Sequence, residues 1–162
     1  MIDFVKIPEE RLKFFRNYVD KLEKLASCKI RINEEISIEA EDPLLLMRVK
    51  EVIKALGRGF DFAIALNLLD EQYCLETINI QEFSGKSKNR MVTMKGRVIG
   101  TEGKAKRLIE KHTNVKITIY GKTISIIGKW DEVQKAKQAV ESLLQGRKHS
   151  TVFKDLMEGR YG

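Results

Sequence analysis

The chain has 162 residues, a formal net charge of +7 and 43% hydrophobic residues, which allows one medium-sized domain or two small ones with a proper core. No apolar run is long enough to cross a bilayer, and Met1–Lys6 lacks the apolar region of a signal peptide. Cys28 and Cys74 are too few for a disulfide framework and lack metal-type spacing. We therefore expect a cytoplasmic protein with two buried thiols.

The charge is divided unevenly along the chain. Residues 1–80 contain 12 Lys and Arg against 15 Asp and Glu, a net −3, whereas residues 81–162 contain 18 against 8, a net +10. Such a basic half favours a polyanionic partner, and we expect only this half to meet one. A solvated lysine-rich surface without a partner is the plainer alternative.

The first half predicts the order strand, helix, hairpin, helix. In chain order these are a strand at Phe4–Ile7, a helix at Glu9–Ser27, a hairpin of Lys29–Asn33 and Ile36–Glu41, a helix at Leu44–Leu56 and a short connecting helix at Phe60–Leu69. Asp42 and Pro43 are typical N-cap and first-turn residues for the last long helix. No glycine interrupts Glu9–Ser27, which predicts one unbroken helix of about five turns.

The second half repeats this order at a period of roughly 80 residues. Its predicted elements are a strand at Cys74–Ile80, a polar turn at Gln81–Lys88, helices at Arg90–Ile99 and Gly103–His112, a hairpin of Val115–Tyr120 and Thr123–Ile127, and a helix at Asp131–Leu144. We predict an α+β fold of two βααββα units, each a three-stranded antiparallel sheet with helices on one face. The first domain is expected over residues 1–70 and the second over residues 71–162.

The segment Gly100-Thr101-Glu102-Gly103 has the form of a GxxG loop, in which a nucleic-acid backbone can approach closely because two residues lack a Cβ. The following helix presents free N–H groups and basic side chains that favour phosphate. We expect the carboxylate of Glu102 to weaken this grip without abolishing the site. The residues that we predict to contact RNA are Arg97, Ile99, Gly100, Thr101, Glu102, Gly103, Lys104, Arg107, Lys111, Lys116 and Thr118.

Other polar and aromatic residues carry weaker signals. We expect His112 to lie in the core or cap its helix, and Trp130 to anchor the last helix. A short helix over Lys154–Glu158 would bury apolar residues, namely Phe153, Leu156 and Met157. Arg147 and Lys148 belong either to a docked C-terminal element or to an RNA-contacting extension. No phosphate loop, metal-ligand cluster or catalytic pair is present, so we expect no cofactor, no metal and no enzymatic activity.

The first half contains no glycine between Pro8 and Lys29, and so it lacks a GxxG loop. Together with its net negative charge, this predicts a structural or protein-contact module for residues 1–70.

Several segments together resemble the archaeal Dim/Pno-type KH (K-homology) proteins, named for the partner of Nob. They are Gly96-Arg97-Val98-Ile99-Gly100, Tyr120-Gly121-Lys122-Thr123, Ile126-Ile127-Gly128, the tail His149-Ser150-Thr151-Val152 and the connector Gly57-Arg58-Gly59-Phe60. The resemblance implies two tandem type I KH domains that bind single-stranded small-subunit ribosomal RNA near its 3′ end and assist ribosome assembly. It also implies, as protein partners, the Nob-type endonuclease and the alpha subunit of initiation factor two. The missing loop in the first half departs from the family pattern.

Two other functions remain open from the sequence. One is a protein-interaction scaffold whose domains are both inert, for which the acidic loop residue Glu102 is the best support. The other is a regulator that binds single-stranded DNA. Salt-dependent binding to RNA would separate the first from an RNA-binding protein, and matched RNA and DNA oligonucleotides would separate the second.

Overall fold

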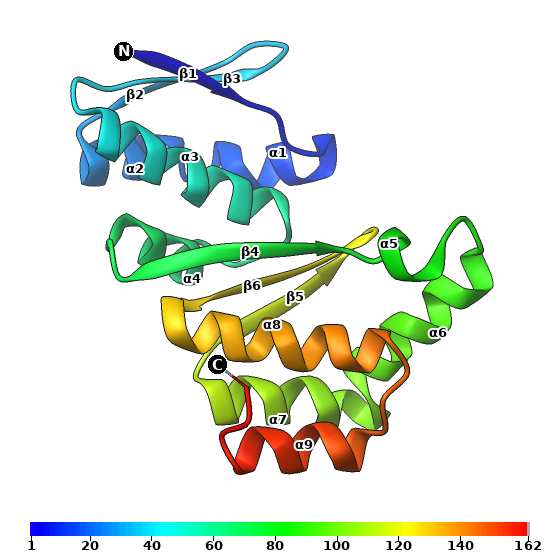
Figure 1. Cartoon of the computed structure of the whole chain (residues 1–162). Coiled ribbons are helices and arrows are strands. Elements are labelled where there is room, and N and C mark those ends of the chain that lie inside the picture. Colours follow the sequence, from blue (N-terminus) through cyan, green and yellow to red (C-terminus); the bar gives the residue numbers. More distant parts are fainter. Residues whose placement is uncertain (162) are drawn as a thin grey trace. The chain divides into compact units, whose positions relative to one another are not determined.

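The computed structural model describes residues 1–161, which form two compact units that divide between Tyr73 and Cys74 (Figure 1). Each unit contains one three-stranded antiparallel sheet and several helices. The predicted mixed α+β class is therefore confirmed.

In the first unit, the sheet has the order β1-β3-β2, and α1, α2 and α3 cover one of its faces (Figure 1). The elements are β1 (Ile2–Val5), α1 (Glu9–Arg16), α2 (Val19–Ala26), β2 (Lys29–Ile32), β3 (Ile36–Glu39), α3 (Pro43–Gly57), α4 (Phe62–Ala65) and a 3₁₀ turn, η1 (Leu66–Leu69). Alternation along β3 buries Ile36 and Ile38 against the helices, and a side-chain oxygen of Asp42 accepts a 2.9 Å hydrogen bond from the Leu44 amide at the start of α3. The N-cap expected at Asp42 is confirmed.

In the second unit, the sheet has the equivalent order β4-β6-β5. The elements are β4 (Tyr73–Asn79), α5 (Gln81–Ser84), α6 (Lys88–Ile99), a 3₁₀ turn η2 (Thr101–Gly103), α7 (Lys104–Thr113), β5 (Lys116–Tyr120), β6 (Thr123–Lys129), α8 (Trp130–Leu144) and α9 (His149–Met157). Ile117 is buried while Lys116 on the same strand is exposed, so the apolar face of the hairpin packs inward as predicted. The additional helix α9 packs against α7 and α8.

The prediction of one unbroken helix over Glu9–Ser27 is wrong. The helix ends at Arg16, and Tyr18 has φ −116° and ψ 0°, far from the φ of about −63° of a regular α-helix, before α2 begins at Val19. The Tyr18 ring stacks on Phe62 with a centroid separation of 4.4 Å. We attribute the break to this long-range aromatic contact, which a local helical pattern cannot reveal.

Several smaller predictions also differ from the structure. Gln81–Ser84 forms a short helix instead of part of a turn, and the last helix begins at His149, not Lys154. Met157 and Trp130 are 65% and 56% exposed, so neither is buried as an anchor, and His112 is exposed on the last turn of α7. None of the helices in residues 1–161 is long and apolar enough to span a bilayer.

One structural arrangement occurs in both units. In the first, the guanidinium of Arg11 on α1 donates to the backbone oxygens of Leu56 and Phe60 at the end of α3, at 2.7 and 3.0 Å. In the second, Arg97 on α6 donates in the same way to Leu143 and Arg147 at the end of α8. A guanidinium therefore ties the first helix of each unit to the end of its long helix.

A second repeated arrangement joins the helix before the hairpin to the first hairpin strand. A carboxylate oxygen of Glu23 accepts from the Ile30 amide at 2.9 Å, and Glu110 accepts from the Ile117 amide at the same distance. Each helix ends in a left-handed residue, Ser27 after α2 or Asn114 after α7. The two units thus share side-chain details as well as strand order.

Candidate nucleic-acid interface

The GxxG segment forms a tight loop between α6 and α7. Gly100, Glu102 and Gly103 have φ values of 76°, 55° and 75°. A Cβ on Gly100 would lie 2.6 Å from the Cβ of Ala105 and 2.7 Å from its amide nitrogen, so no other residue fits without moving the start of α7. The predicted glycine loop is therefore present, and its residues Thr101 and Glu102 are exposed.

Three hydrogen bonds close the loop. The Gly103 amide donates to the Gly100 oxygen at 3.2 Å, the Lys104 amide donates to the Thr101 oxygen, and Nη1 of Arg107 donates to the Glu102 oxygen at 2.7 Å. Arg107 thus uses part of its guanidinium to hold the loop, while the Glu102 side chain is exposed. The backbone carbonyl of Glu102, and not its carboxylate, accepts the hydrogen bond that stabilises the loop.

The start of α7 is suited to an anion. No side chain forms a capping hydrogen bond at this helix end, and the Lys104 amide donates to the Thr101 oxygen, so an anion here would meet the positive end of the helix dipole and not a full set of free amides. Lys104 and Lys111 are exposed on α7, and within the described chain neither forms an ion pair. Lys106, by contrast, pairs with Glu110 at 3.5 Å. The predicted basic stripe of Lys104, Arg107 and Lys111 is on the surface.

Arg97 has a role that the sequence did not reveal. Its Nε donates to the Leu143 oxygen at 2.9 Å and its Nη2 to the Arg147 oxygen at 2.5 Å. The side chain is only half exposed. These bonds direct the guanidinium toward the end of α8, so the structure uses Arg97 as a tether for the helix that leads into the loop.

The remaining predicted contact residues lie on two elements. Ile99, at the end of α6, is 36% exposed and presents an apolar surface next to the loop. Lys116 and Thr118 lie on the outward side of β5, and Lys116 is beyond the far end of α7. With a rise of about 1.5 Å per residue, the length of α7 separates Lys116 from the loop by about 15 Å along the helix axis. The predicted residues therefore lie on the loop, on α7 and on the outward side of β5.

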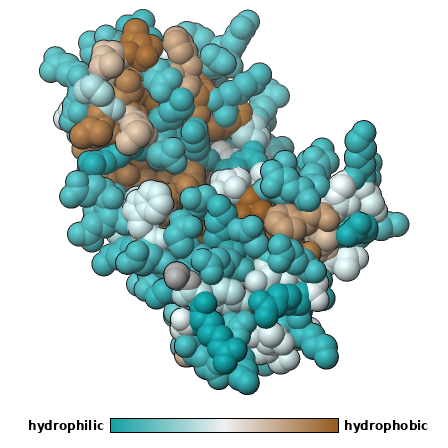
Figure 2. Space-filling view, viewed as in Figure 1, coloured by the Kyte–Doolittle hydropathy of each residue, from teal (hydrophilic) through white to brown (hydrophobic). Residues whose placement is uncertain are grey.

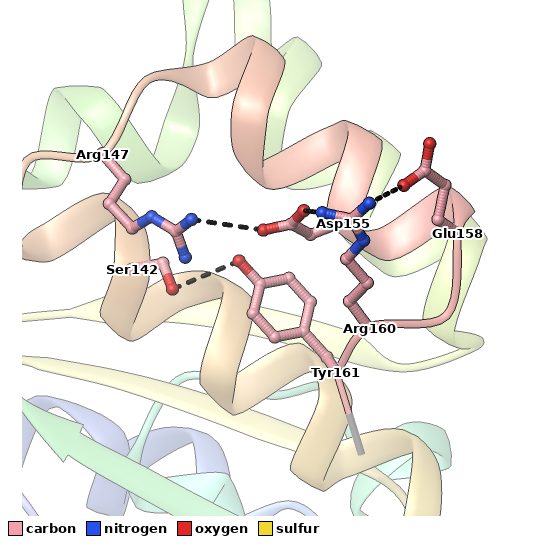
Figure 3. A network of polar contacts seen from close by, with 6 residues as sticks. All are labelled: Ser142, Arg147, Asp155, Glu158, Arg160 and Tyr161. Carbon is pink, nitrogen blue, oxygen red and sulfur yellow. Dashed lines mark hydrogen bonds and ion pairs between the residues drawn. The ribbon is translucent and has the colours of Figure 1, made fainter.

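The C-terminal segment is fastened to the second unit by a polar network (Figure 3). Asp155, buried on α9, pairs with Arg147 at 3.3 Å and with Arg160 at 3.5 Å, and Tyr161 donates to the hydroxyl of Ser142 at 3.2 Å. The Asp155 pairs link residues within the segment, whereas the Tyr161–Ser142 bond and the packing of α9 against α7 and α8 hold it to the unit. The geometry therefore favours the docked element over the RNA-contacting extension.

His149 and Phe153 on α9 complete the surroundings of the loop. Nε2 of His149 lies 2.7 Å from the Arg97 oxygen, in the last turn of α6. A cavity of about 470 Å³ lies between this end of α9 and the loop. Sequence reasoning singled out the tail motif at His149 but did not place it beside Gly100.

Among residues 1–161, no three or more His, Cys, Asp or Glu side chains are placed to hold a metal ion.

On the face shown in Figure 2, the region formed by α7, α8 and α9 is mostly hydrophilic, whereas hydrophobic residues are most extensive over the first unit. The candidate site is therefore a polar, basic surface around an exposed backbone loop.

Comparisons with known proteins identify relatives of the whole chain. A sequence model described as a eukaryotic type KH-domain (KH-domain type I) matches residues 74–160. The KH domain-containing protein MJ0443 of Methanocaldococcus jannaschii is 36% identical, over 98% of this chain and 74% of that protein. The pre-rRNA-processing protein PNO1 of Saccharomyces cerevisiae is 30% identical, over 82% of this chain and 48% of that protein, so the chain spans about half of its length.

A solved structure extends this similarity to three dimensions. A chain of the a/eIF2alpha–aDim2p–rRNA complex from Pyrococcus horikoshii OT3 is similar with a TM-score of 0.87 and 31% sequence identity. The match covers 99% of this chain and 94% of that one. Both units, and not only the matched second half, therefore have counterparts in that structure.

Proposed function

The chain belongs to the KH-domain proteins of the Dim/Pno type, and on this premise we propose that it binds single-stranded small-subunit ribosomal RNA near the RNA's 3′ end and assists ribosome assembly. The observation that carries the proposal is the loop Gly100–Gly103, in which Thr101 and Glu102 are exposed and which leads directly into the basic start of α7. In a KH domain such a loop clamps the backbone of about four nucleotides. The relatives' association with pre-rRNA processing and with rRNA supports the choice of RNA.

Different parts of this site contact the phosphates and the bases of the RNA, as their chemistry indicates. Loop amides and the side chains of Lys104, Arg107 and Lys111 bind phosphates, which gives affinity without reading sequence. Ile99 and the outward side of β5, with Lys116 and Thr118, contact the bases. Arg97 acts through the position of α6, because its guanidinium already bonds two carbonyl oxygens.

We also propose that the chain is a tandem pair of type I KH domains, over residues 1–70 and 71–162. The repeated strand order and the repeated bonds of Arg11 and Arg97 support this duplication. So do the matching bonds of Glu23 and Glu110, which lie 87 residues apart. Two unrelated α+β domains would share the strand order more readily than they would share these side-chain bonds.

The first domain, lacking a glycine loop, contacts proteins or serves the structure. Its α1–α2 turn at Asn17 and Tyr18 carries aromatic rings where the second domain carries glycines. The alpha subunit of initiation factor two is a partner consistent with the complex of the similar Pyrococcus protein, and the Nob-type endonuclease is a second partner implied by family resemblance. The protein acts without catalysis, in the cytoplasm.

The test is a fluorescence-anisotropy titration of a short RNA that copies the small-subunit rRNA 3′ end, across a salt series. Gly103→Asp places a carboxylate at a residue with φ 75°, next to the phosphate site. We expect wild type to bind with strong salt dependence and Gly103→Asp to lose at least about ten-fold in affinity, equivalent to about 1.4 kcal/mol. Circular dichroism confirms that the variant folds.

A matched variant, Gly121→Asp, places the same side chain at another left-handed glycine in the β5–β6 turn, where a Cβ meets nothing within 4 Å. It controls for added negative charge in the second domain. Equal binding by wild type and a folded Gly103→Asp would contradict a role for the loop. Equal affinity for a matched DNA would favour the DNA-binding alternative.

A further inference from the structure

The cavity beside the GxxG loop shares Thr101 and Lys104 with the proposed RNA-binding surface and extends from there to α9. Its volume is about 470 Å³, within the range of roughly 300–1,000 Å³ for small-molecule sites. Three elements contribute to its walls: Thr93 and Gly96 from α6, Thr101 and Lys104 from the loop and the start of α7, and His149 and Phe153 from α9. We call it the α9 cavity. A βααββα domain without the C-terminal extension would have no such wall on the α9 side.

The chemistry of the α9 cavity matches a nucleotide. The rings of His149 and Phe153 are half-buried, and their centroids lie 5.9 Å apart with planes inclined by 47°. Such rings offer surfaces on which a base can stack. Lys104 supplies an exposed cation, with no ion pair within residues 1–161, beside the uncapped N-terminus of α7. Base and phosphate therefore both find partners within one cavity.

The hydrogen bond of His149 adds a possible polar contact. The oxygen of Arg97 can only accept, so Nε2 of His149, 2.7 Å away, must carry the proton. In the neutral ring Nδ1 is then an acceptor, suited to a base amino group or a 2′-hydroxyl. The same bond fixes the imidazole at the wall of the cavity.

The position of the α9 cavity explains how one RNA strand can use both surfaces. Thr93, Gly96 and Gly100 lie three, four and seven residues apart and so share one side of α6. Ile99 follows Gly96 by three residues and therefore lies at the edge of this same face. The loop at the end of α6 follows directly, so a strand clamped there can extend past Ile99 into the cavity.

We propose that the α9 cavity binds one additional RNA nucleotide, directly next to the nucleotides that the loop clamps. The base stacks on Phe153 and His149, and its phosphate lies near Lys104. This inference rests on the proposed function and deepens it, because it assigns a part of the bound RNA to the C-terminal helix.

The experiment measures the affinity gained when the RNA is lengthened. A tetranucleotide from the small-subunit rRNA 3′ end is compared, by calorimetry, with hexanucleotides that add two residues at the 5′ or the 3′ side. Hexanucleotides whose added residues are abasic separate the effect of bases from that of extra phosphates. We expect wild type to bind one hexanucleotide at least about five-fold more tightly than its abasic equivalent, the lower end of the effect of stacking one base.

Two variants alter the α9 cavity in different ways. Gly96→Leu narrows it, because Gly96 lines the cavity and a Cβ at this position meets no atom within 4 Å, and Gly96→Ala is the matched control that leaves most of the space open. Phe153→Ala removes the stacking ring, and Met157→Ala is its control on the exposed side of the same helix. We expect Gly96→Leu and Phe153→Ala to reduce the gain to less than about two-fold while the affinity for the tetranucleotide is kept.

The outcomes separate this inference from the proposed function. Tetranucleotide binding with no gain from added bases, or a gain that both variants keep, overturns the inference and leaves the loop as the RNA site. Equal losses for the tetranucleotide and the hexanucleotide also overturn it, because α9 then acts only through the position of the loop. If wild type binds none of these RNAs, the proposed function fails and the inference fails with it.

Discussion

Replacing Arg97 by alanine is expected to destabilise the second unit. The guanidinium donates to the backbone oxygens of Leu143 and Arg147, and a net hydrogen bond that involves a charged group contributes about 1.5–3 kcal/mol. The side chain is half exposed, so water can replace part of each bond after the change. We therefore expect a loss of about 2–4 kcal/mol in the free energy of unfolding. Arg97→Lys keeps the positive charge but lacks the forked donors of the guanidinium, and it is expected to lose roughly half of this free energy of unfolding.

The assay is urea denaturation followed by circular dichroism and by the fluorescence of Trp130, the only tryptophan in the sequence. Trp130 begins α8, so its signal reports on the second unit. With a slope of about 1–2 kcal/mol per molar urea, the fluorescence midpoint is expected to fall by roughly 1 M or more. Arg11→Ala removes the equivalent bonds in the first unit and should shift the dichroism while leaving the RNA affinity unchanged.

One result would refute this reasoning. If Arg97→Ala keeps the wild-type midpoint and yet loses RNA affinity with a smaller salt dependence, Arg97 binds a phosphate directly, as the sequence suggested. If the urea midpoint falls and the RNA affinity falls without a change in its salt dependence, Arg97 acts by holding α6 to the end of α8.

Three further predictions follow from single features. A Cβ on Gly128 would lie 2.8 Å from Cγ1 of Val115, so Gly128→Ala should lower the stability by about 1–3 kcal/mol, and an unchanged melting temperature would contradict the packing. Lys104→Ala and Lys111→Ala should each reduce the slope of log affinity against log salt by about 0.7, measured by anisotropy, whereas an unchanged slope would remove that lysine from the interface. Burial raises the pKa of the Cys28 thiol above its ordinary value of 9.0. Labelling of Cys28 by iodoacetamide near pH 8, followed by mass spectrometry, should therefore be much slower in the folded protein than in urea. Equal labelling rates would contradict the burial of Cys28.

Most of the fold could be predicted from the sequence, because the signals were local. Alternation along the hairpin strands and the Asp42-Pro43 helix start depend on neighbouring residues, and the structure contains both. The break near Tyr18 could not be predicted in this way. It depends on a ring 44 positions away in the chain, at Phe62, and a helix pattern carries no information about such a contact.

In the candidate site, too, local features could be predicted from the sequence and long-range contacts could not. The pattern of glycines predicted the loop, since a residue such as Gly100 is needed wherever φ is positive and a Cβ would collide. The role of Arg97 was not visible, because an arginine next to a glycine loop has the same sequence signature whether it binds phosphate or backbone oxygens. Only the position of α8 distinguishes the two, and that position results from the packing of the whole unit.

The comparison of the two units gives the reason to place function at the loop. Arg11 and Arg97 lie 86 residues apart, whereas Glu23 and Glu110 lie 87 apart, so the stretch between the two tethers differs by one residue. That stretch holds the α1–α2 turn in the first unit and the GxxG loop in the second. The bonds on either side occur in both units, which means that the fold does not require glycines or a longer loop at this point. The three positive φ values at Gly100, Glu102 and Gly103 distinguish the second unit at this point, and they serve a ligand rather than the fold.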